Sequence, residues 1–156
     1  MPTIDRETLE RKLGFLSRYR RDLGAYASLD TAGRRREHYA VERLLQLLCE
    51  CAADIALQFL KARGETLPAS YREIFSTLEQ AGVLPPALAT DLIAAWGMRN
   101  LLTRLYEQID LERVVAAVDP AMVLYGAFAQ WALDQLGGGG PGTGETPAHE
   151  SPARPD

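Results

Sequence analysis

The chain has 156 residues, which is the size of one ordinary domain, and its 47% hydrophobic and 24% charged residues exclude a largely disordered protein. A net charge of −4 argues against a protein that binds nucleic acid over its whole surface. No apolar run approaches the ~18 residues of a membrane span, and the N-terminal residues lack the apolar segment of a signal peptide. We therefore expect a cytoplasmic protein that makes no contact with a membrane.

Apolar residues recur at helical spacing along most of the chain, beginning with Leu9, Leu13, Leu16 and Leu23. No segment alternates with the period of two that a strand requires. The sequence therefore predicts an all-α helical bundle of about five helices. The expected helices run from about Asp5 to Leu29, from Tyr39 to about Ala62, from Tyr71 to Gln80, from Ala87 to around Tyr106, and from Leu111 to Leu136 with a break at Val118, after which Asp119 and Pro120 restart the helix.

The helical domain is expected to cover residues 1–136. From residue 137 onward the sequence GGGGPGTGETPAHESPARPD has almost no apolar side chains, which predicts a disordered C-terminal tail over residues 137–156. The glycines resemble a phosphate-binding loop, but no predicted strand precedes them and no predicted helix follows. We interpret them as a linker.

Positive charge is concentrated in the first 45 residues, which hold ten of the 17 Lys and Arg residues against seven acids. This part of the chain has a local charge of +3, and the remainder has −7. Such arginines attract phosphate, although taken by themselves they fit a solvated helix face and a loop better. The residues concerned are Arg18, Arg20, Arg21, Arg34, Arg35 and Arg36.

Cys49 and Cys51 are two residues apart on a predicted helix, so their side chains point in different directions. They cannot chelate one metal ion together. We expect two reduced thiols and no metal site.

The segment MRNLLTRLYEQID, residues 98–110, places polar side chains on an otherwise apolar helix. On an ideal helix Arg99, Thr103 and Tyr106 project from nearly the same face, whereas Arg104 lies about 140° around the axis from Arg99. A cleft that uses both arginines therefore requires a bend in the helix or a contribution from two copies of the chain.

The same segment resembles the signature of the HepT toxins of the HEPN superfamily, commonly written RNxLxHxY. Arg99, Asn100, Leu102 and Tyr106 match this pattern, and Arg104 stands where the family has histidine. The likeness extends over about residues 5–136. It includes YAVERLLQLLCECAADIA, similar to the family's second helix with Glu42, Gln46 and Asp54 at polar positions, PASYREIFSTLEQAGVLPPALA, similar to its middle connection, and the acids Asp110 and Glu112 after the motif.

The resemblance implies a HEPN-like fold and a toxin that cleaves RNA as an endoribonuclease, without a metal ion or cofactor. It also implies a homodimer, either alone or within a larger toxin–antitoxin complex, in which the two motifs line a shared basic cleft. The implied partner is an MNT-type nucleotidyltransferase antitoxin. In this family the antitoxin transfers AMP from ATP to the motif tyrosine, here Tyr106, and so blocks the cleft.

The chemistry explains why such a site needs these residue types. Cleavage of RNA through its 2′-hydroxyl requires a group that removes one proton and returns another, and positive charge on the phosphate. Arg99 and Arg104 suit phosphate binding, and Asn100 can orient the phosphate by hydrogen bonds. Arg104 cannot accept a proton at neutral pH, so we expect the chain to bind RNA or its antitoxin but to cleave poorly.

Two explanations account for Arg104. A single base change converts a histidine codon to an arginine codon, so an active toxin is readily recovered with this lesion, or the natural protein carries arginine. The two histidines of the chain are candidate substitutes for the missing imidazole. His38 begins the second predicted helix, and His149 lies in the tail.

Without the resemblance, Arg99 and Arg104 are typical of salt-bridge residues, with Asp91 or Glu107 as partners, and Tyr106 of an aromatic residue at the core edge. A second function of another class is a non-catalytic helical adapter whose cleft binds a nucleotide or a partner's helix. It explains Arg104 without a mutation.

Overall fold

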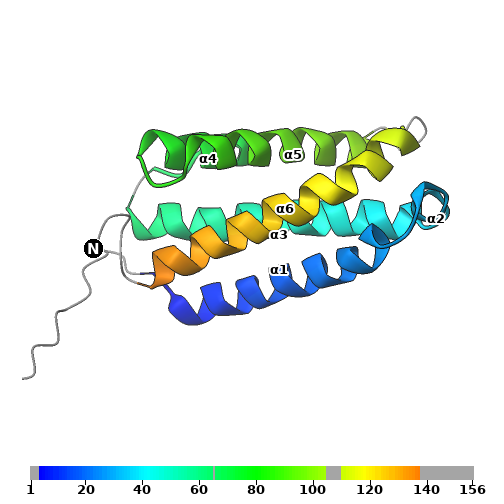
Figure 1. Ribbon diagram of the computed structural model, residues 1–156. Helices are drawn as coiled ribbons and strands as arrows, with labels where there is room; N and C mark the ends of the chain where they lie inside the picture. Colours follow the sequence, from blue (N-terminus) through cyan, green and yellow to red (C-terminus); the bar gives the residue numbers. More distant parts are fainter. Residues whose placement is uncertain (1–3, 65, 105–109, 138–156) are drawn as a thin grey trace, which may run out of the picture.

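The computed structural model describes residues 4–64, 66–104 and 110–137, apart from the side chains of Thr103 and Arg104. Within these residues the chain is all-α, as predicted (Figure 1). The described part contains six helices rather than about five, because a short helix lies between the first two expected helices. The helices are α1 (Arg6–Ala27), α2 (Thr31–Arg36), α3 (His38–Ala62), α4 (Tyr71–Gln80), α5 (Pro86–Arg104) and α6 (Leu111–Leu136).

The helices form an elongated bundle in which α3 contacts each of the other five (Figure 1). The long helices α1, α3 and α6 pack against one another. Helices α4 and α5 contact each other, and both pack against α3. The short α2 lies at the end of the bundle where α5 ends and α6 begins (Figure 1). This end therefore holds the C-terminal part of the motif helix.

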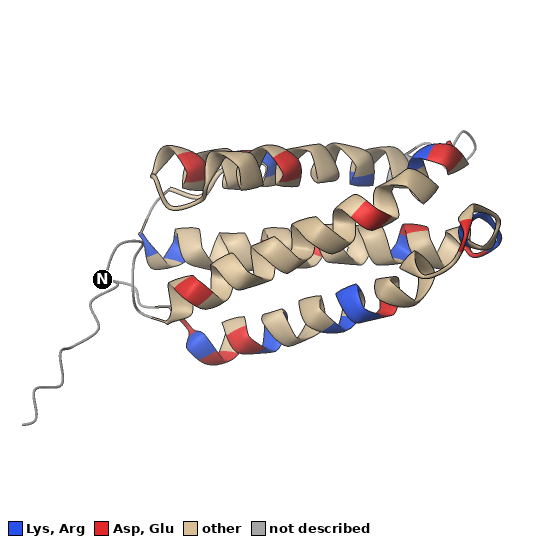
Figure 2. Ribbon diagram, viewed as in Figure 1, with Lys and Arg blue, Asp and Glu red and all other residues tan. Residues whose placement is uncertain are grey.

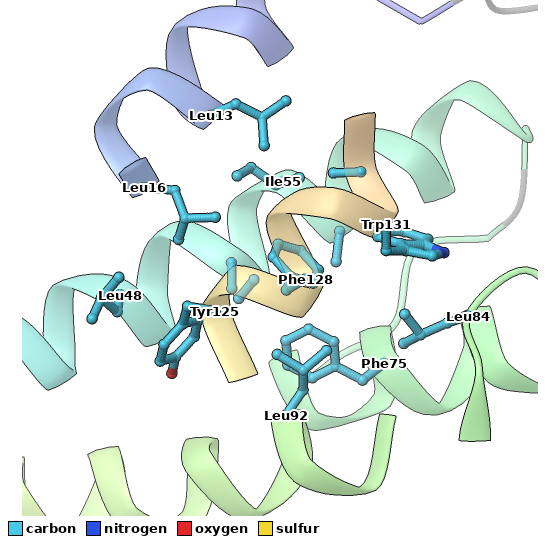
Figure 3. Close-up of a cluster of buried hydrophobic side chains, with 14 of the residues drawn as sticks. Leu13, Leu16, Leu48, Ile55, Phe75, Leu84, Leu92, Tyr125, Phe128 and Trp131 are labelled. Atoms are coloured by element: carbon cyan, nitrogen blue, oxygen red, sulfur yellow. The ribbon is translucent and has the colours of Figure 1, made fainter. Parts of the chain in front are cut away.

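The bundle core is built from the apolar stripes that the sequence shows. Leu9, Leu16 and Leu23 of α1 are fully buried, as their helical spacing predicts. From α6, Tyr125, Phe128 and Trp131 project into the same core, where they lie among leucine, isoleucine and phenylalanine side chains of the other helices (Figure 3).

Local signals set most helix ends. Asp5 caps α1 by accepting a hydrogen bond from the Thr8 backbone N–H. Gly64 and Gly82, which follow the ends of α3 and α4, have φ angles of 70° and 75°, a conformation that glycine adopts without strain. Helix α5 is described up to Arg104, so its expected end near Tyr106 lies outside the described residues, as does the tail over residues 138–156.

The predicted break in the last helix is wrong. Helix α6 is continuous from Leu111 to Leu136 with Pro120 inside it, although an internal proline removes one backbone hydrogen bond. The buried residues Val114, Val118 and Ala121 form one apolar stripe across the proline, and packing of this stripe compensates for the lost bond. Asp119 does not cap a helix; its carboxylate binds Arg34 of α2.

Helix α6 is also long and apolar enough to cross a membrane by length and composition, with a mean hydropathy of 1.3 in its most apolar window. Most of its residues carry no charge (Figure 2). Core helices of soluble proteins pass the same test. Here the apolar residues of α6 pack against α1 and α3, which gives their hydropathy a structural reason.

Candidate active site

The guanidinium group of Arg99 on α5 is held by a carboxylate from α3. Its Nη2 and Nε donate to Oε1 of Glu50 at 2.6 and 3.2 Å, and its Nη1 lies 3.5 Å from Oδ1 of Asn100. The guanidinium carbon lies 5.0 Å from the centre of the Trp96 ring, a cation–π geometry. The Arg99 side chain is 25% exposed, so it is anchored within the protein and still reachable from solvent.

Further side chains support this arrangement. Gln46, one turn before Glu50 on α3, donates from Nε2 to the same carboxylate oxygen at 3.4 Å. On the other side, the ring of Tyr71 lies 4.7 Å from that of Trp96, centre to centre. Arg99 is therefore the centre of a network contributed by α3, α4 and α5.

Arg99 also lines a groove of about 1050 Å³ between α5 and α6. The lining is mainly apolar, with Leu45 of α3 and Leu88, Met98, Leu102 and Leu124 among its residues. Its charged residues are two arginines and two aspartates. Because α5 and α6 are antiparallel, Arg99 and Arg113 lie toward one end of the groove, and Asp91 and Asp134 toward the other.

The structure describes only some of the predicted site residues. Arg99 and Asn100 lie next to each other with their polar groups in contact. The backbone of Arg104 continues α5 as a helix, but its side chain is not described, and Tyr106 lies outside the described residues. The backbone is helical from Arg99 to Arg104, so both residues belong to one uninterrupted helix.

The sequence alone did not point to Glu50. It offers Asp91 as a partner of Arg99, but the carboxylate that binds Arg99 comes from a residue 49 positions away in the sequence. The other alternative, Glu107, lies outside the described residues. A signal was present, because Glu42, Gln46 and Glu50 recur every four residues and so share one face of α3.

The arginine-rich α2 is tied to α6. Arg34 binds the Asp119 carboxylate, and Arg35 forms an ion pair with Glu112. Asp110 caps α6 by accepting from the Glu112 backbone N–H at 3.0 Å, so both acids that follow the motif have structural contacts. Among the α1 arginines, Arg20 donates from Nε to the Met122 carbonyl of α6 at 2.8 Å. These contacts favour the structural interpretation of Arg20, Arg34 and Arg35.

His38 forms a separate pair with Glu42, whose Oε2 lies 2.9 Å from His38 Nδ1. Glu50 lies three steps of four residues beyond His38 on α3, which is about 18 Å along the helix axis. Glu50 anchors Arg99, so a phosphate bound by Arg99 lies near Glu50. Within one subunit His38 is therefore too distant to act on that phosphate. His149 lies outside the described residues.

Burial makes the thiols of both cysteines unreactive. Cys49 and Cys51 are free, and burial raises the pKa of Cys49 to about 12 and that of Cys51 to about 11. Within the described ranges no group of His, Cys, Asp and Glu side chains has a metal-binding arrangement.

Comparison with known families places this arrangement in context. The family model described as ribonuclease HepT-like matches residues 9–125, which include Glu50 of α3 and the whole motif. The chain belongs to the ribonuclease HepT-like family. The resemblance based on the motif is thereby confirmed at the level of the family.

Two HepT-like relatives carry names that state a substrate. The tRNA nuclease HepT of Aphanizomenon flos-aquae is 27% identical over 133 residues, which are 83% of this chain and 90% of the relative. The mRNA nuclease HepT of Shewanella oneidensis is 31% identical over 74 residues, which are 47% of this chain and 56% of the relative.

Solved structures show the same HepT-like fold. YutE of Bacillus subtilis has a TM-score of 0.73 at 22% identity, over 87% of this chain and 93% of its own. The HEPN toxin of Shewanella oneidensis, solved in tri-AMPylated form with its MNT antitoxin, has a TM-score of 0.70 at 22% identity, over 81% of this chain and 96% of its own. These likenesses confirm the predicted HEPN-like bundle.

Proposed function

We propose that this chain is the toxin of a HEPN/MNT toxin–antitoxin system, acting in the cytoplasm on RNA, and that Arg99 binds the phosphate at which RNA is cut. The observation that carries the proposal is the oriented, partly exposed Arg99 beside Asn100. The names of two relatives, a tRNA nuclease and an mRNA nuclease, support RNA as the substrate.

The proposed reaction needs no metal ion or cofactor. The 2′-oxygen of a ribose attacks the adjacent phosphorus, its proton leaves to a base, and the 5′-oxygen of the next nucleotide departs with a proton. The products are a 2′,3′-cyclic phosphate and a 5′-hydroxyl. Arg99 stabilises the negative charge that grows on the phosphate oxygens, and Asn100 orients them by hydrogen bonds.

Arg104 accounts for the expected weakness of this chain as an enzyme. A guanidinium with a pKa of ~12 or above adds positive charge to the RNA site but cannot remove or return a proton at neutral pH. The chain therefore binds RNA and cleaves it poorly. Within one subunit His38 lies too far along α3 to replace the proton transfer that Arg104 cannot perform.

The proposed assembly is a homodimer formed through the groove between α5 and α6. A groove that is mainly apolar and continuous with Arg99 suits a contact between two copies. Its charges are self-complementary, because a two-fold axis crossing α5 between Asp91 and Arg99 brings the basic end of one groove to the acidic end of the other. Each Arg99 then lies about 6 Å from the axis along α5, on the usual helical rise, and near the acidic end of the partner's groove.

The proposed partner is an MNT-type nucleotidyltransferase antitoxin that attaches AMP to Tyr106. Support comes from the Shewanella oneidensis toxin, which is AMPylated and bound to an MNT antitoxin. AMP adds negative charge and bulk to the motif that carries Arg99, and this charge opposes the binding of an RNA phosphate.

A second candidate is a non-catalytic adapter, favoured by the same groove, whose apolar lining suits the apolar face of a partner's helix. The two candidate functions predict different neighbouring genes. The toxin proposal requires a neighbouring reading frame for a small nucleotidyltransferase with paired acidic metal ligands, and the adapter does not.

The decisive experiment restores the imidazole. We expect Arg104→His to raise the rate of RNA cleavage by roughly 10²–10⁴-fold, in the presence of EDTA, and to slow the growth of cells that express it. The double variant Arg104→His/Arg99→Ala is the control that keeps the imidazole and removes the phosphate contact. If Arg104→His degrades neither tRNA nor mRNA and leaves growth unchanged, the nuclease proposal is wrong for this chain.

A further inference from the structure

Glu50 is the residue that determines where the Arg99 guanidinium points. One of its oxygens accepts from both Nε and Nη2 of Arg99, so the carboxylate holds the guanidinium along one edge. The ring of Trp96 lies 5.0 Å from the guanidinium carbon and limits movement of the guanidinium group toward the ring. These contacts come from α3 and from the preceding turn of α5, and together they limit the rotamers open to a long, flexible side chain.

The carboxylate itself is restrained. Gln46 donates to the same Glu50 oxygen from one turn earlier on α3, and the Glu50 side chain is only 35% exposed. The opposite part of the guanidinium, Nη1, lies beside Asn100.

We infer that Glu50 is a positioning residue that orients Arg99 toward the RNA phosphate, an inference that rests on the proposed function. Glu50 touches no reacting atom in this scheme. It restricts the rotamers of Arg99 before RNA binds. The Arg99 side chain then loses less conformational entropy when it binds the phosphate. A purely neutralising role is the contrary interpretation, in which the carboxylate weakens the attraction of Arg99 for phosphate.

Two substitutions separate these roles. Glu50→Ala removes both the acceptor and the charge, whereas Glu50→Gln removes the charge and keeps an oxygen that can accept from Arg99. For the chain with Arg104 we expect Glu50→Ala to weaken binding of a short RNA roughly three- to tenfold, the scale of one hydrogen bond, and Glu50→Gln to restore most of it. In the Arg104→His background we expect Glu50→Ala to raise KM roughly three- to tenfold through the weaker binding and also to lower kcat about tenfold, as misplacement of a catalytic group does.

The controls separate this inference from the proposed function. Glu10→Ala removes an equal charge from an exposed position on α1, which among the described residues makes no contact with α5, and should leave RNA binding unchanged. In the Arg99→Ala background, Glu50→Ala should have no further effect, because a positioning residue acts only through Arg99. If Arg99→Ala itself does not weaken RNA binding, the proposed function fails.

If Arg99→Ala weakens binding but Glu50→Ala does not, only the positioning role is overturned. That role is likewise overturned if Glu50→Ala binds RNA more tightly or cleaves it faster, since this result identifies a neutralising carboxylate. Circular dichroism and the midpoint of thermal unfolding establish that each variant is folded before it is assayed.

Discussion

Arg34 and Asp119 join α2 to the middle of α6 across 85 positions of the sequence. Nη2 of Arg34 lies 2.9 Å from one carboxylate oxygen of Asp119, and Nη1 lies 3.2 Å from the other. Arg34 also donates to the carbonyls of Ala27 at 2.7 Å and Val115 at 3.3 Å. A residue that the sequence offers as an RNA-binding candidate therefore connects three helices.

The first prediction concerns this connection. Because the Arg34 side chain is only 12% exposed and serves three acceptors, we expect Arg34→Ala to lower the free energy of unfolding by about 1–3 kcal/mol. Arg35→Ala is the matched control, since its pair with Glu112 is half exposed and should contribute less than about 1 kcal/mol. Urea unfolding followed by circular dichroism measures both. Equal losses for the two variants would contradict the structural role of Arg34.

The second prediction compares two helical glycines. A Cβ at Gly14 of α1 meets nothing within 4 Å, so Gly14→Ala should stabilise the fold by about 0.5–1 kcal/mol through helix propensity. A Cβ at Gly126 of α6 would lie 2.8 Å from Nη2 of Arg20, whose Nε is bound to the Met122 carbonyl. Gly126→Ala must displace that arginine, and the loss of its hydrogen bond, about 1 kcal/mol, offsets the same gain in helix propensity, so this variant should not be stabilised. Thermal unfolding of the pair tests this, and a stabilised Gly126→Ala variant would show that Arg20 moves at no cost.

The third prediction tests the dimer. Val123 lines the groove between α5 and α6 and is 73% exposed, so a charge there opposes burial against a second copy. We expect the unmodified chain to sediment as a dimer and Val123→Glu to sediment as a monomer with unchanged helix content. Leu133→Glu is the control, because Leu133 is also exposed on α6 but does not line the groove. A monomeric unmodified chain at high concentration would refute the proposed assembly.

The fourth prediction concerns the thiols. Burial raises the pKa of Cys49 from 9.0 to about 12 and that of Cys51 to about 11, because it disfavours the thiolate. At pH 8 the folded protein should therefore react with iodoacetamide much more slowly than the protein in urea, as measured by intact mass. The same shifts favour the folded state below pH 9, and this contribution is lost as the pH rises from about 9 to 12. Labelling at equal rates in buffer and urea would show that the thiols are accessible.

The fold was largely predictable from local patterns. Leu9, Leu16 and Leu23 reveal α1 because a helix buries one side at a fixed spacing, and Gly82 ends α4 because its φ is positive. Pro120 was misinterpreted, since a proline preceded by aspartate has the same local appearance at a helix start and within a helix. Only the buried stripe on both sides of it decides between the two.

The candidate site shows the same division. The sequence alone identified the family and made Arg99 and Asn100 candidate site residues, because both depend on the order of residues along the chain. Which carboxylate holds Arg99, and which acids bind the arginines of α2, was decided by tertiary structure. Glu50 reaches Arg99 only because α3 and α5 pack side by side, and Asp119 reaches Arg34 only because α2 turns onto α6. A local pattern states which face of a helix is polar, but the partner of that face is set by how the helices pack.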